Sequence, residues 1–177
     1  EDTTLDATHD FTAGDNNASL SSAAAINTAA VHIGTNGLDI PTAADNALFV
    51  VSSGDLVSMI EGSLGFWFRI VDFTAGPTLV NIDNSAAANM HLRVQQSGTD
   101  ELDFRFRFQG GSNIGLATIA ADLALDTWYF VIVRWDSVAN DRRVEVYNED
   151  GSLRNSTDDV TTDWDVATGI DRMFWGE

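Results

Sequence analysis

The chain has 177 residues, enough for one domain, and 44% of them are hydrophobic, which suffices for a buried core. Twenty-seven acidic residues face nine basic ones, for a net charge of −18, and a surface of that kind repels nucleic acid and anionic membranes. We expect no membrane insertion, since no apolar run reaches the ~20 residues that span a bilayer.

The quality of the charge is also informative. All nine basic residues are arginine, and lysine and cysteine are absent. The absence of lysine favours adaptation to high salt, where repulsion between carboxylates is screened. The alternative is an ordinary extracellular or cell-surface β-protein with acidic loops. If the first interpretation holds, the melting temperature rises between low and molar salt.

Short runs of β-branched and aromatic residues, separated by turn signals, predict strands along the whole chain. In the first half the expected strands are 31–33, 38–40, 45–51, 65–71, 78–82 and 90–95. In the second half they are 102–108, 114–119, 127–135, 142–147 and 173–175, with a turn at 148–151. Residues 1–30 are treated as an N-terminal extension or edge segment.

Many short strands and almost no helical periodicity predict an all-β fold, an antiparallel sandwich or barrel. The run 127–135 has apolar residues on both faces, which predicts a central strand, and the run 102–108 alternates cleanly. We expect Trp128, Trp135, Trp164 and Trp175 to serve the core or its rim. No linker divides the chain, so residues 1–177 are expected to form a single domain.

Four stretches carry a resemblance to a known family. They are VHIGTNGLDI (31–40), GSLGFWFR (62–69), TWYFVIVRWD (127–136) and VEVYNEDG (144–151). In this order and spacing they resemble the laminin G-like modules of the concanavalin A-like lectin and glucanase superfamily. The resemblance implies an antiparallel two-sheet jelly roll and a role in adhesion or recognition, often within a longer protein.

One feature departs from the family pattern. Laminin G-like modules usually add a closing strand after the one matched by residues 173–176, whereas this sequence ends at Glu177. Either the sequence is a fragment, or residues 1–30 fill the gap, or a neighbouring chain does. An open sheet edge would favour self-association by strand pairing.

The segment 101–105, Glu-Leu-Asp-Phe-Arg, is similar to the Glu-x-Asp-x-Glu strand of the superfamily's retaining glucanases. Those enzymes need two carboxyl groups at the scissile bond. Arg105 stands where the second glutamate would be, and a guanidinium does not act as a general acid near neutral pH. We expect no enzymatic activity, and a solvent-facing strand with paired charges explains the segment more simply.

Strand parity predicts a candidate ligand-binding surface. It places these side chains on polar strand faces: Trp67, Arg69, His91, Arg93, Arg105 and Arg107. If the strands share one sheet, arginine forks and an aromatic ring could hold an acidic sugar. The alternative is that the arginines pair internally with acidic residues.

Calcium is the one cofactor that the composition suggests, because it binds carboxylate, amide and carbonyl oxygens in flexible loops. The candidate ligands are Asp136, Asn140 and Asp141, in the loop between two predicted strands. Acidic loops also arise by chance in a chain so rich in aspartate, and no loop shows the complete spacing of an EF-hand.

The sequence thus favours a non-catalytic extracellular recognition or adhesion module that binds a glycan or a protein surface. A second hypothesis is a structural coat, decoration or fibre subunit of a virion or cell-surface filament. A third, less favoured, is a glycan-cleaving enzyme, which would require a second carboxylate opposite Glu101.

Overall fold

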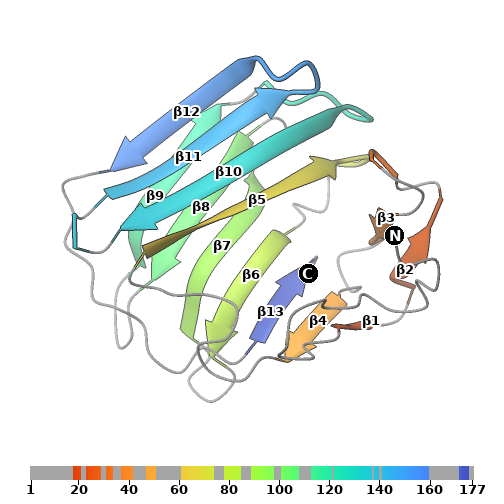
Figure 1. Ribbon diagram of the computed structural model, residues 1–177, viewed down its shortest axis with the longest axis horizontal. Helices are drawn as coiled ribbons and strands as arrows, with labels where there is room; N and C mark the ends of the chain where they lie inside the picture. The colour runs from red at the N-terminus through yellow and green to blue at the C-terminus, as the bar shows by residue number, and fades with distance from the viewer. Residues whose placement is uncertain are drawn as a thin grey trace.

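The computed structural model describes residues 18–20, 23–28, 31–33, 37–41, 47–50, 61–73, 78–84, 89–97, 101–107, 113–120, 122–136, 138–139, 141–159 and 172–175. Every regular element in these ranges is a β-strand, and the strands form two antiparallel sheets and one separate pair (Figure 1). The fold is an all-β, two-sheet jelly-roll sandwich, as the sequence predicts. The described ranges contain no helix long and apolar enough to cross a membrane.

The smaller sheet has four strands in the order β12-β11-β10-β5. Their bounds are β5 (Glu61–Arg69), β10 (Trp128–Asp136), β11 (Asp141–Asn148) and β12 (Leu153–Asp159). The aromatic and β-branched run of β10 makes it a central strand, paired on both sides. The edge strand β12 escapes sequence prediction because its composition, LRNSTDD, is almost entirely polar.

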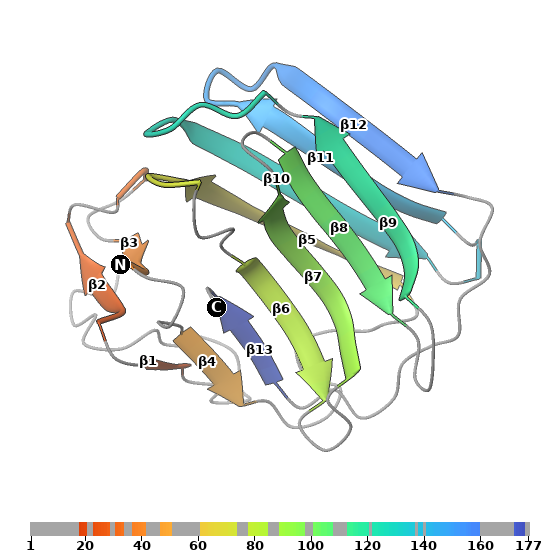
Figure 2. The same cartoon turned by 180° about the vertical axis from the view of Figure 1, so that it is seen from behind.

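The larger sheet has seven strands in the order β1-β4-β13-β6-β7-β8-β9, and Figure 2 brings it to the front. Its strands are β1 (Ala18–Leu20), β4 (Ala47–Val50), β6 (Thr78–Asn84), β7 (Asn89–Ser97), β8 (Glu101–Arg107), β9 (Asn113–Ala120) and β13 (Arg172–Trp175). Strands β6 to β9 form a meander, because each of them pairs antiparallel with the strand that precedes it in the chain.

The last strand is an interior one. Strand β13 pairs with β4 on one side and with β6 on the other, so it does not form the open edge expected from the sequence (Figures 1 and 2). The edges of the described sheets are instead β1 and β9 in one, and β5 and β12 in the other. Self-association remains a prediction, which light scattering on the purified chain tests: an ordered polymer supports a structural subunit, and a stable monomer contradicts it.

A separate strand pair lies beside the sandwich. It consists of β2 (Ala25–Asn27) and β3 (Gly37–Asp39). The expected strand at 31–33 is wrong, because His32 and Ile33 form a bend between β2 and β3. His32 therefore belongs to no strand, and its side chain contacts Trp67 and Trp128 of the four-stranded sheet.

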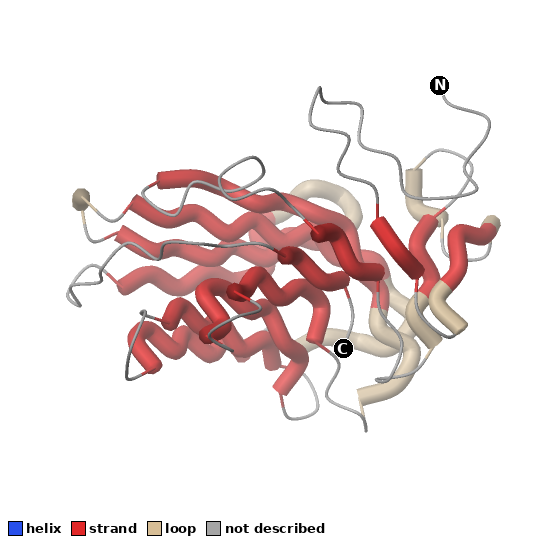
Figure 3. Tube along the Cα trace, turned by 90° about the horizontal axis from the view of Figure 1, so that it is seen from below, coloured by secondary structure: helices blue, strands red, loops and turns tan. Residues whose placement is uncertain are grey.

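The core lies between the two sheets, which appear as two layers of strands in Figure 3. Its fully buried side chains come from both layers: Val80, Ile82, Leu102, Val131, Val133, Val144 and Val146. Aromatic side chains close the core toward its rim, where Phe66 meets Trp175 edge-on at 4.8 Å between ring centroids. Trp135 and Trp175 therefore serve the core as expected, and Trp164 lies outside the described residues.

The turn between β11 and β12 is fixed by local hydrogen bonds, as the Asn-Glu-Asp-Gly sequence predicts. Gly151 adopts a φ of 83°, a conformation that favours glycine, and its N–H donates to the Asn148 carbonyl at 3.0 Å. The Asp150 carboxylate accepts from the backbone N–H and the hydroxyl of Ser152. These hydrogen bonds, the hydroxyl's first, hold the pKa of Asp150 below its ordinary value.

Candidate ligand-binding surface

The four-stranded sheet has two chemically distinct faces. Along β10 the side chains of Tyr129, Val131, Val133 and Trp135 are buried, while the residues between them are half-buried or exposed. Because successive side chains on a strand point to opposite faces, the second set faces away from the core. This outer face carries Trp128, Phe130, Ile132 and Arg134, and it is the candidate site.

The neighbouring strand β5 adds further side chains to the outer face. Trp67 lies opposite Phe130, and Arg69 lies opposite Trp128. The ring centroids of Trp67 and Phe130 are 5.1 Å apart, and the Arg69 guanidinium carbon lies 5.4 Å from the centroid of the Trp128 ring. We call the side chains of Trp67, Trp128 and Phe130 the aromatic surface.

Gly65 makes room for this surface. A Cβ at that position would lie 3.0 Å from the Phe130 Cζ atom, tighter than ordinary van der Waals contact. The Phe130 ring therefore extends over the backbone of β5 beside Trp67. Gly65 and Trp67 are neighbours on the same face of β5, and Phe130 is the partner of Trp67 on β10. The missing side chain of Gly65 leaves the space that the large Phe130 ring occupies.

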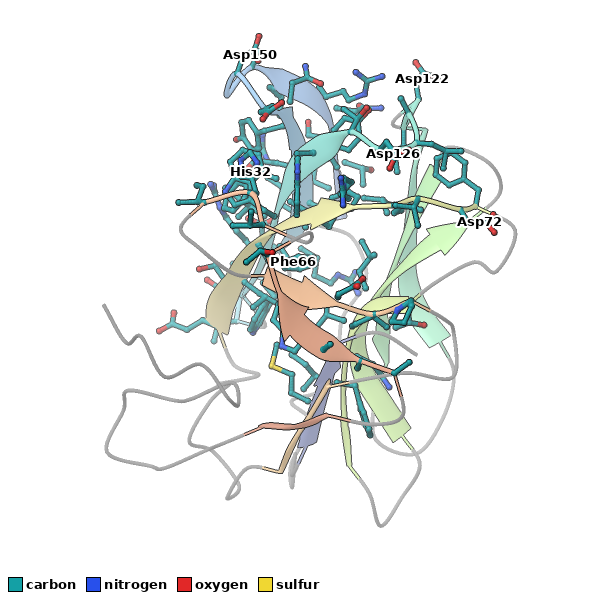
Figure 4. The ribbon with its side chains drawn as sticks, turned by 90° about the vertical axis from the view of Figure 1, so that its right-hand side faces the viewer. His32, Phe66, Asp72, Asp122, Asp126 and Asp150 are labelled. Atoms are coloured by element: carbon teal, nitrogen blue, oxygen red, sulfur yellow. The ribbon has the colours of Figure 1, made fainter. Side chains whose placement is uncertain are left out.

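His32 closes one end of the aromatic surface. Its ring centroid lies 4.0 Å from that of Trp67 and 4.9 Å from that of Trp128, both in tilted geometry. Its Nδ1 atom is 3.7 Å from an oxygen of Glu149, which lies in the β11–β12 turn. Figure 4 shows His32 beside the four-stranded sheet, near the turn that carries Asp150. A segment far away in sequence thus contributes a ring to the surface.

A charged group occupies the same outer face farther along β10 and β11. Glu145 has a side chain only 8% exposed, and its two oxygens contact Arg143 at 3.0 Å and Arg134 at 3.1 Å. Both arginine side chains are about half exposed, at 43% and 54%. The contact from Arg134 is misaligned for a hydrogen bond, so the charge of the guanidinium alone holds that oxygen.

The six predicted ligand-binding residues do not share a sheet. Trp67 and Arg69 belong to β5 of the four-stranded sheet, whereas His91 and Arg93 belong to β7 of the seven-stranded sheet. The remaining two, Arg105 and Arg107, lie on β8, next to β7. The condition for a single surface, one shared sheet, is therefore not met, because parity does not tell which strands belong to the same sheet.

Within the larger sheet, Arg93 and Arg105 are Cα partners, and Asp103 is the partner of Gln95. Arg93 therefore lies on the strand next to Asp103, diagonally across from it. The Glu101–Arg105 segment lies on β8, in the sheet that does not carry the aromatic surface. Whether His91, Arg93, Arg105 and Arg107 bind a ligand remains a prediction.

Two of the three predicted calcium ligands lie together. Asp136 ends β10 and is the Cα partner of Asp141, which begins β11, while Asn140 lies outside the described residues. One carboxylate oxygen of Asp136 already accepts the backbone N–H groups of Val138 and Ala139, each at 2.9 Å. In the described part of the chain, no three His, Asp or Glu side chains are grouped as metal ligands. Calcium binding stays a prediction, which calorimetric titration would test.

Sequence reasoning missed several residues of the outer face. The sequence predicts Trp128 in the core or its rim, because a run of aromatic residues does not show which of its alternate side chains face inward. The strict alternation in β10, once Tyr129 is placed in the core, would have found it. His32 carried no signal, since its role depends on a bend that brings distant segments together.

No protein-family model matches this chain, and no curated protein matches it. Solved structures do. A mutant form of HCR/D has a TM-score of 0.63 at 11% identity, covering 96% of this chain and 41% of that one. A protein of unknown function from Shewanella oneidensis MR-1 has a TM-score of 0.58 at 13% identity, covering 93% and 71%. The Ruminococcus gnavus IT-sialidase CBM40 bound to alpha2,3 sialyllactose has a TM-score of 0.49 at 15% identity, covering 67% and 64%.

At such low identity these likenesses show the fold alone, and the third is too weak to support an argument. The chain spans 41% of the length of the HCR/D structure that it matches. The comparisons place the chain among the jelly-roll sandwiches. The laminin G-like resemblance within that class stays a prediction.

Proposed function

We propose that this chain is a non-catalytic recognition module that binds glycans through the aromatic surface of the four-stranded sheet. The observation that carries the proposal is the position of Trp67, Trp128 and Phe130 on the outward side, away from the core between the sheets. Rings on a rigid, shallow face can stack against the C–H groups of a sugar and remove apolar area from water without a deep pocket.

The polar groups around the rings support the same function. Arg69 places a planar cation beside Trp128, and a guanidinium offers several donors in a fixed geometry to sugar hydroxyls. His32 and Glu149 add a donor and an acceptor at the end of the aromatic surface. A few fixed polar groups around an apolar contact area are what orient a bound ligand.

The carboxylates of this face favour binding without hydrolysis. Glycosidases need a protonated and an ionised carboxyl group on either side of the bond that is cleaved. Glu145 is engaged by two arginines, at 3.0 and 3.1 Å, so both of its oxygens are already in ion pairs. We therefore assign the face a role in recognition, with an extracellular or cell-surface glycan as the ligand class.

The proposal is tested by binding measurements on an array of immobilised neutral and acidic oligosaccharides, followed by calorimetry with the best probe. We expect the wild-type chain to bind at least one oligosaccharide. Trp128→Ala and Trp67→Ala are expected to weaken that binding tenfold or more, equivalent to about 1.4 kcal/mol.

The matched control is Val138→Ala, since Val138 is 84% exposed in the β10–β11 turn, away from the rings. It is expected to leave the affinity unchanged. Circular dichroism would establish that all three variants are folded. The proposal is wrong if no oligosaccharide binds, or if both tryptophan variants bind as tightly as the wild-type chain.

A further inference from the structure

Arg134 and Arg143 form an unusual pair on the outer face. They are direct Cα partners on β10 and β11, a position in which two like charges repel each other. The Glu145 carboxylate contacts both guanidinium groups and compensates this repulsion. Two cations therefore share one carboxylate in a chain whose net charge is −18.

Most of the donors of this pair remain available. Each guanidinium has five N–H donors, and each contacts Glu145 through its Nη2 nitrogen. Glu145 is the only acidic side chain of the described residues within ion-pair distance of either arginine. Both arginine side chains are about half exposed, so an anion in solution can approach them.

Glu145 also fixes the geometry of the pair. Its side chain is 8% exposed, so it sits beneath the two arginine heads and restrains them. Two guanidinium groups held on one carboxylate are preorganised, which lowers the entropy cost of closing them around a ligand. Arginine forks of this kind match the paired oxygens of a carboxylate or sulfate group.

The distance between the arginine pair and the aromatic surface sets the size of the ligand. Arg134 follows Phe130 by four residues on β10, which corresponds to roughly 13 Å along the strand. Ile132 and Gly65 lie between them, and Ile132 is the Cα partner of Glu145. A single sugar ring is too short to reach both places, so an extended oligosaccharide is required.

We infer that Arg134 and Arg143, seated on Glu145, form an anion clamp that binds a carboxylate or sulfate group of an acidic oligosaccharide whose other end stacks on the aromatic surface. This inference rests on the proposed glycan binding and names the ligand class for it. Uronate carboxylates and sulfate esters share the required chemistry, a compact anionic group with several acceptor oxygens.

Replacing the acidic residue next to the clamp tests whether the affinity for an anionic ligand can be raised. Asp158 is the Cα partner of Arg143 on β12, and it is exposed. Its charge competes with an incoming anion. Asp158→Asn is therefore expected to raise the affinity for an acidic oligosaccharide several-fold, whereas affinity for its neutral counterpart stays the same.

The loss test is the triple variant Arg134→Gln, Arg143→Gln and Glu145→Gln, which removes the clamp without leaving a buried charge unpaired. Calorimetry would compare three oligosaccharides of equal length: neutral, uronate-containing and sulfated. The wild-type chain is expected to bind at least one acidic probe tenfold more tightly than the neutral one, with an advantage that shrinks as salt rises. The triple variant is expected to lose this advantage and to retain binding of the neutral probe.

Val138→Asp is the control for net charge, because it also adds one negative charge but on the exposed turn. It is expected to keep the preference for the acidic probe. If the wild-type chain binds neutral and acidic probes equally, or if the triple variant keeps the preference, the clamp is wrong while the proposed function stands. If no probe binds the wild-type chain, both fail. If both tryptophan variants bind as tightly as the wild-type chain, the proposed function fails, and with it the stacking that the inference assumes.

Discussion

The inner and outer faces of the four-stranded sheet use similar residues for different purposes. On β10, Trp135 faces inward and is 4% exposed, while Trp128 faces outward and contacts His32 and Arg69. The inner face gains stability by removing apolar area from water, whereas the outer face keeps rings and charges within reach of a ligand. One strand therefore carries both the core and the candidate site, and alternation keeps the two separate.

The largest expected difference between the faces comes from the two tryptophans. Trp135→Ala removes a buried ring and is expected to lower the free energy of unfolding by about 3–5 kcal/mol. Trp128→Ala removes a half-buried ring and is expected to cost roughly 1 kcal/mol, mainly lost contact with His32 and Arg69. Denaturant unfolding of both variants measures the difference. Equal losses would mean that the outer rings form a second core.

The two glycines of β5 also distinguish the inner face from the outer one, with a smaller expected effect on stability. A Cβ on Gly62 would lie 2.5 Å from the buried Trp135 ring, so Gly62→Ala is expected to cost about 1–3 kcal/mol by overpacking. In Gly65→Ala the Cβ meets the tip of the half-buried Phe130 ring at 3.0 Å, and that ring can move outward. Its cost is expected to be below about 1 kcal/mol. The reverse order in thermal unfolding would contradict the assigned faces.

The turn at the end of β10 tests the role of Asp136. Asp136→Ala removes the acceptor of two backbone N–H groups and is expected to destabilise the chain by about 1 kcal/mol. Asp136→Asn retains an acceptor oxygen and is expected to recover most of that loss. The same two variants, titrated with calcium, separate a turn-capping role from a metal ligand. A melting temperature that rises with calcium only in the wild-type chain would favour the ligand.

The smallest expected effect concerns Asp150, which is fully exposed. Hydrogen bonds from Ser152 lower its pKa in the folded state, so its contribution is present above the unfolded pKa and is lost as pH falls through the folded one. The loss therefore falls below about pH 4. Asp150→Asn is expected to reduce the steepness of acid unfolding slightly. If stability falls with decreasing pH in the same way in the wild-type and variant chains, the hydrogen bonds of Asp150 make no contribution to stability.

The sequence predicts much of this architecture for a clear physical reason. Strong alternation and aromatic runs locate β8, β10 and β11, and in β10 and β11 the burial of the side chains follows the pattern. The expected strand at 38–40 corresponds to β3, whereas β2 and β12 have no counterpart among the expected strands, since polar or very short strands depend on their neighbours for stability.

The site was harder to predict than the strands. Parity tells which residues share a face of one strand, but it does not tell which strands share a sheet. Arg69 and Arg93 therefore looked alike in sequence although they belong to different sheets. The clamp depends on the register of β10 against β11, and register is set by the whole sandwich.

The interior position of β13 has a consequence for how the chain acquires its structure. Strands β4 and β6 are near each other in sequence, but the strand that joins them, β13, comes from the other end of the chain. During synthesis the strands β1 and β4 cannot join the strands β6 to β9 in one sheet until residues 172–175 have been made. Such long-range pairing predicts slow folding and a period in which the edges of β4 and β6 are open to wrong partners.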